Sequence, residues 1–394
     1  MSDYIAQSEA AGRVLLPDLV RAVALIGIAV VNVGVFAYSI DETFYAGLYS
    51  TVDRVAVFLV NTLFAAKSYP LFSFMFGVGF AYQIQAAERR GVEFNNRYLR
   101  RLIALFVIGV FHAWAMFVGD ILVAYALLGL LLLGMKDLSP KSLKTWAGWL
   151  IGVWVSLAAL FAVVLLLVAS SGADFSDASG FAMMDEEMVS LFQTGSFFDI
   201  SAVRLDIYTA VVTANLFTSG PIVGAFFILG LLAVRTGSIA DPNHTVWAKA
   251  RWLLLPTVAA SAVLAWVSVQ AESMMDPYAL FAMLAMLAVA PFQAFAYLGW
   301  IAKWAARPHS GLRTFLARGG TATLTAYLFQ SLVMSMVFCG YGLGLFNKLP
   351  ASHAVVIALA TAFLSISVMS LWRMRFSRGP LEEGLRRWTY LGAR

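Results

Sequence analysis

The chain has 394 residues, of which 61% are hydrophobic and only 12% are charged. Soluble globular proteins average roughly 45–50% apolar and about 25% charged residues, and the mean hydropathy here is +0.81. So few charges cannot cover a water-facing surface of this size. Composition therefore excludes a soluble enzyme, a nucleic-acid-binding module and a disordered chain. We expect an all-α, polytopic integral membrane protein that has membrane lipids, and no nucleic acid, among its partners.

Several kinds of chemistry are not indicated by the residues present. The single cysteine, Cys339, excludes an intrachain disulfide and a cysteine-based metal site. No two histidines have ligand spacing on one helix, and no phosphate-binding loop of the P-loop type is found. We therefore expect no metal cofactor. Residues 1–18 lack a cationic start, and the apolar stretch after them is too long for a signal peptide, so we expect it to be retained.

Stretches that could cross a bilayer follow one another along the chain. A span needs roughly 20 apolar residues, and ten stretches qualify: 19–38, 69–87, 101–118, 120–135, 144–169, 207–234, 248–270, 277–302, 321–340 and 352–373. A further stretch, 52–66, would reach only about 22 Å. We interpret it as a short interfacial or re-entrant helix. Counting it as a span gives an alternative of eleven.

The charges between these stretches predict an orientation. Lys and Arg concentrate in cytosolic loops, and here they gather in 88–101, 136–144, 303–318 and the tail 375–394. Ten spans place all four segments, and both termini, in the cytosol, whereas eleven spans put the N-terminus outside. The longest loop, 170–206, is acidic and is expected to be extracytoplasmic. The tail, with Pro380 near the start of a short amphipathic segment, is expected to be a cytosolic interfacial helix.

Ionisable side chains at membrane depth are costly and indicate function by default. On the first predicted helix Asp18 and Arg21 can pair, and Asn32 follows Arg21 by eleven residues, which is three helical turns. A salt bridge at the cytosolic end and a helix-packing Asn are the alternatives to a functional role.

The third predicted span repeats this offset with Arg101 and His112. The chain then turns at Gly119 and Asp120 and descends past Tyr125, which should bring His112, Asp120 and Tyr125 near one another. A His beside a carboxylate is suited to act as a general base. Alternatively, His112 bonds a neighbouring carbonyl and Asp120 caps the next helix.

Other polar residues give weaker signals. Tyr327 and Gln330 lie on the polar side of the ninth span, where they could line a cavity and contact substrate or simply hydrogen-bond between helices. Lys67, just before Pro70, could snorkel at the outer interface or contact substrate.

Taken together, five separated motifs resemble the YeiB-like family of bacterial membrane proteins, a domain of unknown function. They are Asp18-Leu19-Val20-Arg21 through to Asn32; the run from Pro70 to Gly79; His112 with Gly119-Asp120-Ile121-Leu122 and Tyr125; Leu324-Thr325-Ala326-Tyr327-Leu328 with Gln330-Ser331; and Arg378-Gly379-Pro380-Leu381-Glu382 with Trp388. The resemblance covers nearly the whole chain. It departs from the family pattern at Ala22, Thr321 and Ala326.

This family is similar, more remotely, to the transmembrane acyltransferases. That resemblance implies transfer of an acyl group from cytosolic acyl-CoA to an acceptor hydroxyl or amine on the other side of the membrane. The O-acyltransferases have a catalytic His eleven residues after an Arg on an early helix, and Asn32 stands at that position here. His112, at a similar predicted depth, could replace it.

The leading hypothesis is therefore an acyl-CoA-dependent acyltransferase in the bacterial cytoplasmic membrane. In it, His112 and Asp120 deprotonate the acceptor, and Asn32 or Tyr125 stabilises the oxyanion. Arg21, Arg97, Arg100 and Arg101 form the expected set of cofactor contacts with acyl-CoA phosphates. The alternatives are a transporter or exporter of a small or lipid-like molecule, and a non-catalytic membrane scaffold. The acceptor is expected to be a small molecule, a lipid or a sugar, and a homodimer is possible.

Overall fold

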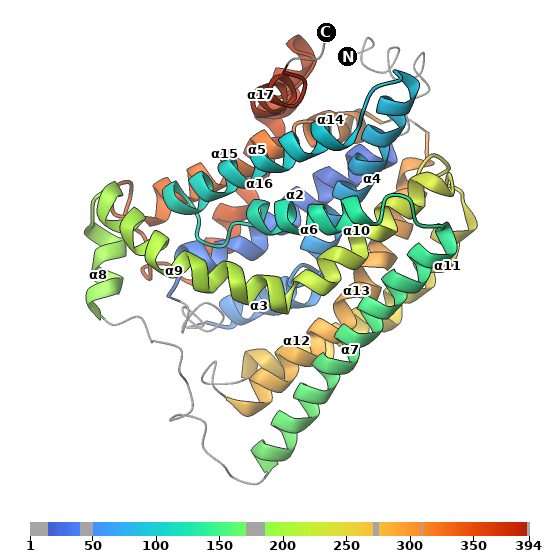
Figure 1. Ribbon diagram of the computed structural model, residues 1–394. Coiled ribbons are helices and arrows are strands. Elements are labelled where there is room, and N and C mark those ends of the chain that lie inside the picture. The colour runs from blue at the N-terminus through green and yellow to red at the C-terminus, as the bar shows by residue number, and fades with distance from the viewer. Residues whose placement is uncertain (1–14, 40–49, 171–185, 271–275, 309, 392–394) are drawn as a thin grey trace.

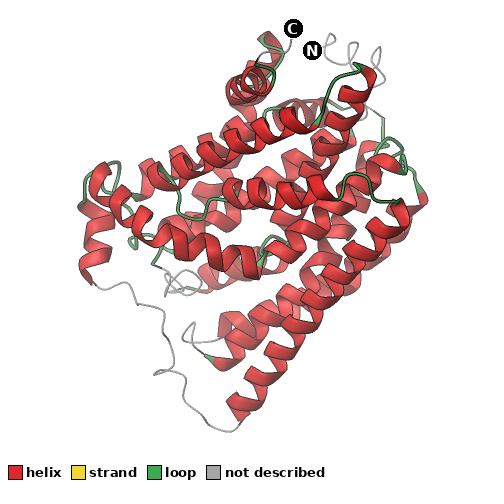
Figure 2. Ribbon diagram, in the orientation of Figure 1, coloured by secondary structure: helices red, strands yellow, loops and turns green. Residues whose placement is uncertain are grey.

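The computed structural model describes residues 15–39, 50–170, 186–270, 276–308 and 310–391. All regular structure within these ranges is helical (Figures 1 and 2). The helices are α2 (Leu16–Ala37), α3 (Thr51–Leu63), α4 (Ser68–Arg89), α5 (Asn95–Ala115), α6 (Leu122–Gly134), α7 (Pro140–Ser170), α8 (Glu186–Thr194), α9 (Phe197–Thr218), α10 (Gly220–Arg235), α11 (Thr245–Ala250), η2 (Arg251–Leu253), α12 (Leu254–Gln270), α13 (Pro277–Ala305), α14 (Gly311–Gly320), α15 (Thr323–Phe338), α16 (Ala351–Arg375) and α17 (Pro380–Thr389).

Helix α2 is the centre of the bundle. It is apolar around nearly its whole circumference, and its residues Leu19, Ala22, Ala24 and Leu25 are completely buried. A helix that is hydrophobic on all sides must be surrounded by other apolar elements. Here α4, α14, α15 and α16 surround it. The polar groups of α2 are therefore held at fixed positions within the protein.

The outer helices present apolar side chains to the surroundings. Leu167 on α7, Phe217 on α9 and Leu255 on α12 are 62%, 78% and 80% exposed. Soluble proteins rarely expose contiguous apolar surface on this scale. Eight of the described helical segments are long and apolar enough to cross a membrane, or nine if the bent pair α14–α15 counts as one. The predicted class, a helical membrane protein, is confirmed, whereas ten or eleven spans and the side of each terminus stay predictions.

The bounds of one predicted span are wrong. The stretch 207–234 is divided between two helices, α9 and α10, which meet at Ser219. Pro221 has no backbone N–H and restricts the residue before it, so the chain breaks here despite its continuous hydrophobicity. Helix α9 begins at Phe197, and α8 precedes it, so the second half of the predicted loop 170–206 is helical.

Other helices are also interrupted. Helices α14 and α15 meet at 85°. The stretch 52–66 largely forms α3, and residues 64–67 separate α3 from α4, with Ala66 at a positive φ of 61°. An interruption frees backbone groups that must find other partners within a membrane.

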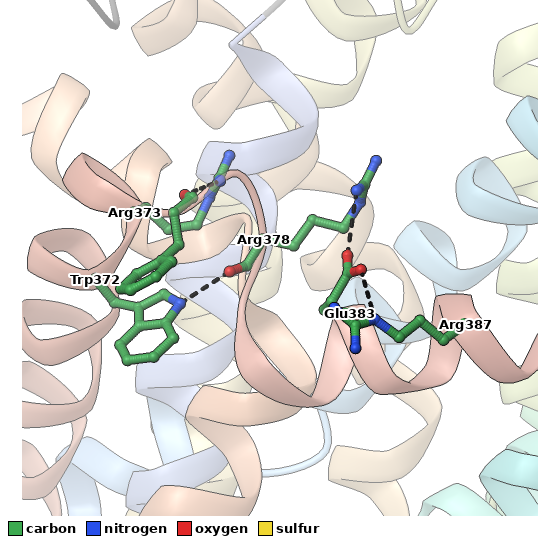
Figure 3. Close-up of polar contacts among 6 residues, drawn as sticks. Trp372, Arg373, Arg378, Glu383 and Arg387 are labelled. Atoms are coloured by element: carbon green, nitrogen blue, oxygen red, sulfur yellow. Dashed lines mark hydrogen bonds and ion pairs between the residues drawn. The ribbon is translucent and has the colours of Figure 1, made fainter.

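The predicted tail helix is observed as α17, which follows a tight turn after α16 (Figure 3). The Trp372 indole donates to the Arg378 carbonyl at 2.9 Å. Arg378 and Arg387 both donate to the carboxylate of Glu383, at 3.3 and 3.1 Å. These hydrogen bonds, that from Arg387 first, lower the pKa of Glu383. The ion pairs therefore persist at neutral pH and weaken only when the pH falls through that lowered pKa.

Candidate functional site

Two cavities lie near opposite ends of α2. We call the first the Asn32 cavity; it measures about 170 Å³, and its polar wall residues are Asn32, Ser68, Tyr69, Asp120, Asn215, Ser219 and Tyr327. The second, the Arg101 cavity, measures about 250 Å³, and its polar wall residues are Arg21, Arg101, Thr321, Thr323, Glu382, Tyr125 and Tyr327. Asn32 and Arg21 stand about 16 Å apart along the helix axis.

Tyr327 of α15 is common to both walls. Its side chain is buried, and its hydroxyl has no hydrogen-bond partner. The ring lies against the imidazole of His112, with centroids 5.0 Å apart. Tyr327 therefore borders both cavities and also contacts His112.

His112 and Asp120 form a completely buried pair. His112 lies near the C-terminal end of α5, and its Nδ1 is 2.8 Å from Asp120 Oδ1. The other carboxylate oxygen of Asp120 accepts the backbone N–H of Val123, in the first turn of α6, at 2.9 Å. The two carboxylate oxygens thus make different contacts, one with His112 and one with the start of α6, and a catalytic role for Asp120 stays a prediction.

The contact with Asp120 selects one form of the neutral imidazole. When Nδ1 carries the proton and donates it to the carboxylate, Nε2 retains its lone pair. His112 Nε2 is buried and has no partner. It is therefore the atom available to accept a proton. His112 is not itself in either cavity wall, whereas its neighbours Asp120 and Tyr327 are.

The Tyr125 hydroxyl already has hydrogen-bond partners within the protein. This hydroxyl is 2.7 Å from Ser73 Oγ and donates to the Tyr69 carbonyl at 3.2 Å. Tyr125 lies in the wall of the Arg101 cavity rather than beside His112. Asn32 is in the wall of the Asn32 cavity together with Asp120. Of the two predicted oxyanion donors, neither contacts His112 directly.

The four predicted arginines separate into two groups. Arg21 and Arg101 line the Arg101 cavity; Arg21 pairs with Asp18 at 2.9 Å, and Arg101 Nε is buried without a partner. The guanidinium of Arg97 instead lies over the Tyr390 ring, 5.2 Å from its centroid, and Arg100 donates to the Leu391 carbonyl. Only the first pair lines one of the two cavities described above.

Two predicted substrate contacts, Lys67 and Gln330, line neither cavity. Lys67 is completely buried, so the snorkelling interpretation is wrong. Its ammonium donates to the Asn61 carbonyl at 2.6 Å, where it stabilises the C-terminal end of α3. Gln330 donates to Ser365 Oγ at 2.9 Å and so joins α15 to α16, as the helix-packing interpretation predicts.

Glu382 and Asn215 are among the wall residues that sequence reasoning missed. Glu382 of α17 reaches the Arg101 cavity, where its Oε1 accepts the N–H of Leu324 at 2.7 Å and its Oε2 accepts the Thr325 hydroxyl at 2.6 Å. The sequence offered a signal, since α15 begins without a capping side chain of its own. Asn215 of α9 carried no comparable signal, because the sequence does not show whether a single Asn in an apolar helix faces a cavity, another helix or the surface.

The comparisons with known proteins extend over the whole chain. Residues 233–392 match DUF418, a family described as of unknown function. The uncharacterized protein YxaH of Bacillus subtilis is 29% identical over 96% of this chain and 94% of its own length. The uncharacterized protein YeiB of Escherichia coli is 26% identical over 93% of each chain.

A shorter match covers 39% of this chain and 42% of an uncharacterized 39.9 kDa protein of Bacillus acidopullulyticus, at 33% identity. No solved structure matches the chain. Tyr327 and Glu382 fall within the DUF418 match, whereas His112 and Asp120 precede it. The resemblance to the YeiB-like family is confirmed, by YxaH and YeiB over nearly the whole chain and by DUF418 over its C-terminal part.

Proposed function

We propose that this protein is an acyl-CoA-dependent acyltransferase of the bacterial cytoplasmic membrane. The observation that carries the proposal is the buried His112–Asp120 pair beside Tyr327, a residue that lines both a cavity with two arginines and a cavity with amides and hydroxyls. An enzyme that joins substrates from two sides of a membrane needs such an arrangement. The bacterial relatives and the apolar outer helices support the location.

The residues that line the Arg101 cavity suit part of a thioester substrate, namely the acyl chain and the pantetheine arm. Its apolar wall, which includes Phe72, Phe76 and Leu105, suits an acyl chain and the pantetheine arm. Arg21 and Arg101 offer donors for anionic oxygens, and Arg101 Nε has no partner within the protein. At about 250 Å³ the cavity takes only part of acyl-CoA, so the nucleotide end would remain outside it.

The reaction requires movement of one side chain. When the Tyr327 ring turns away, the two cavities join and His112 Nε2 faces the acceptor. The acceptor oxygen or nitrogen then bonds to the thioester carbonyl carbon while its proton passes to Nε2. The Tyr327 hydroxyl donates to the oxyanion. Cleavage of the C–S bond releases the thiolate, which takes the proton back from Nε2.

Thermal unfolding of the purified protein with and without acetyl-CoA tests this proposal. A ligand that binds only the folded state at about 100 times its Kd stabilises it by about 2.7 kcal/mol. We expect stabilisation of the wild type and of Arg97→Gln, and its loss in Arg101→Gln, because only Arg101 lines the cavity. His112→Ala should still bind acetyl-CoA but transfer no acyl group. Absence of stabilisation in the wild type would contradict the proposal.

A transporter is the second candidate, and the interrupted helices favour it. The junctions α3–α4, α5–α6 and α9–α10 contribute wall residues to the Asn32 cavity, and the α14–α15 junction contributes to the Arg101 cavity. Many transporters build their binding sites from such discontinuous helices. Stabilisation by a cargo molecule, with no response to acetyl-CoA, would select this candidate.

A further inference from the structure

A third cavity adjoins the Asn32 cavity. It measures about 180 Å³ and is enclosed by α3, the α3–α4 junction, α12 and α13, with a contribution from α2. Val31 and Ala66 belong to its wall and also to the wall of the Asn32 cavity. We call it the Met283 annex. The two spaces are therefore neighbours that share these two wall residues.

The annex differs from the Asn32 cavity in polarity. Its wall consists mainly of aliphatic and thioether side chains, namely Val31, Ala65, Ala279, Leu280, Met283, Met286 and Leu287. Its two polar residues contact each other, since Asn61 Nδ2 donates to Ser268 Oγ at 3.5 Å. The Asn61 carbonyl accepts from Lys67. Apart from Asn61 and Ser268, the residues that line the annex are apolar, so it offers mainly apolar surface to a ligand.

The annex also reaches the surface that faces lipid. Met283 is 37% exposed, and it lies on α13, one of the helices long and apolar enough to cross a membrane. Helix α12, on the other side of the annex, exposes Val263 and Trp266 at 65% and 59%. Met283 lines the annex and is also exposed beside apolar surface, so we expect a hydrocarbon chain to reach the annex from the lipid next to α13.

We infer that the acceptor is an amphiphile, whose hydroxyl- or amine-bearing head occupies the Asn32 cavity and whose hydrocarbon chain occupies the Met283 annex. This inference rests on the proposed function, because it names the class of acceptor. The inference rests on the difference in polarity between the two cavities. In the Asn32 cavity, Asn32, Asn215 and Ser219 can hydrogen-bond a polar head. The chain is held by apolar contact alone and gains free energy with each buried methylene.

Photocrosslinking tests the annex without requiring catalysis. The full-length protein in nanodiscs is labelled with a monoacylglycerol that carries a diazirine in its chain, and the labelled peptides are identified by mass spectrometry. We expect labelling within 61–66, which forms one wall of the annex. The lipid-facing part of α7 around Leu167 supplies the internal reference for labelling from the bulk bilayer.

Two substitutions fill the annex from opposite walls, Ala279→Phe and Ala65→Leu. Each should abolish labelling within 61–66 and leave labelling of α7 unchanged. The matched control is Ala259→Phe on α12, where the side chain is exposed and lines none of the three cavities. Thermal unfolding identifies a variant that fails to fold. If one annex variant does so, the labelling of the other annex variant decides whether the annex binds the chain.

The outcomes separate the two proposals. Labelling that is absent from 61–66, or that is equal in the annex variants and in Ala259→Phe, overturns the annex as a chain site. Labelling lost only in the annex variants supports it, even if acetyl-CoA fails to stabilise the protein and the acyltransferase proposal falls. Equal acyl transfer to glycerol and to monoacylglycerol would overturn the amphiphile while leaving the acyltransferase intact.

Discussion

Asp120 uses its two carboxylate oxygens for two different purposes. One oxygen orients His112, and the other accepts the Val123 N–H in the first turn of α6. The approach is possible because Gly109 lies one turn before His112; a Cβ there would stand 2.8 Å from Asp120 Oδ2 and from Val123. The contact with His112 and the contact with the start of α6 are thus combined in a single side chain.

Asp120→Asn separates these two contacts. The amide oxygen can still accept from Val123, so we expect the thermal stability to change little. The amide NH2 would face His112 Nδ1 and favour the tautomer in which Nε2 carries the proton. Acyl transfer should then fall by a factor on the order of 10³–10⁴, as when the equivalent change is made in a serine protease triad. Two quantities are measured for each variant, the rate of acyl transfer and the unfolding temperature.

The matched variant Asp120→Ala removes both contacts. It should lose acyl transfer and also lower the free energy of unfolding by about 0.5–2 kcal/mol, the usual effect of deleting a helix N-terminal cap. If Asp120→Asn kept wild-type activity, the orienting role of Asp120 would be refuted.

At the scale of elements, helices α4 and α10 pack so closely that glycines are required. A Cβ on Gly77 would lie 2.0 Å from the Phe227 carbonyl oxygen, and one on Gly230 would lie 2.1 Å from the Phe74 carbonyl oxygen. Small residues of this kind allow helix backbones to approach in membranes. Helix α4 also supplies Ser68 to one cavity and Phe72 and Phe76 to the other.

Gly77→Ala should therefore destabilise the protein by about 1–3 kcal/mol, the usual range for overpacking. Gly79, on the same helix, has open space where its Cβ would stand. Gly79→Ala is the control, and it should be neutral or stabilising by up to about 1 kcal/mol because Ala is the better helix former. Unfolding temperatures in detergent give the comparison, and equal effects at the two positions would contradict close packing of α4 on α10.

Glu382 bonds helix α17 to the start of α15. Its carboxylate accepts from Leu324 N and from Thr325 N and Oγ1, which supplies the start of α15 with partners. Glu383, one residue later, contacts only Arg378 and Arg387 near the surface. Exposed ion pairs of this kind contribute little.

Glu382→Ala should loosen α17 and expose the bonds after Arg386 and Arg387 to trypsin, whereas Glu383→Ala should leave the cleavage rate near that of the wild type. The quantity measured is the rate of cleavage within the tail at neutral pH. Equal rates in the two variants would show that α17 is held by its other contacts, among them the Trp388 indole bonded to the Arg100 carbonyl at 2.9 Å.

At the scale of the whole molecule, the predicted orientation places the Asn32 cavity and the Arg101 cavity on opposite sides of the membrane. The chain is suited to a direct test because Cys339 is its only cysteine and is buried. Asn32→Cys should react with a membrane-impermeant thiol reagent added outside, and Thr323→Cys with the same reagent added to inverted vesicles.

A further substitution tests whether Tyr327 separates the two cavities. Adding Tyr327→Ala to either cysteine variant should make each cysteine reactive from both sides, because Tyr327 is common to both walls. Reaction of both cysteines from the same side, with Tyr327 intact, would contradict the orientation.

The sequence by itself determined the features that depend on composition or on neighbouring residues. The shortage of charge requires a membrane environment, and the amphipathic pattern after Pro380 predicts α17. His112 and Asp120 are eight residues apart across a short turn, so local geometry alone is nearly sufficient to bring them together.

Only the tertiary structure decided which distant residues meet. Tyr327 lies against His112, and Glu382 accepts the N–H of Leu324. Arg101 lines the Arg101 cavity, whereas Arg97 does not. The physical reason is that an apolar helix face has the same sequence whether lipid or protein covers it. Lys67 illustrates the same limit, since its position at a predicted helix end suited an interface, yet the fold buries it against the Asn61 carbonyl.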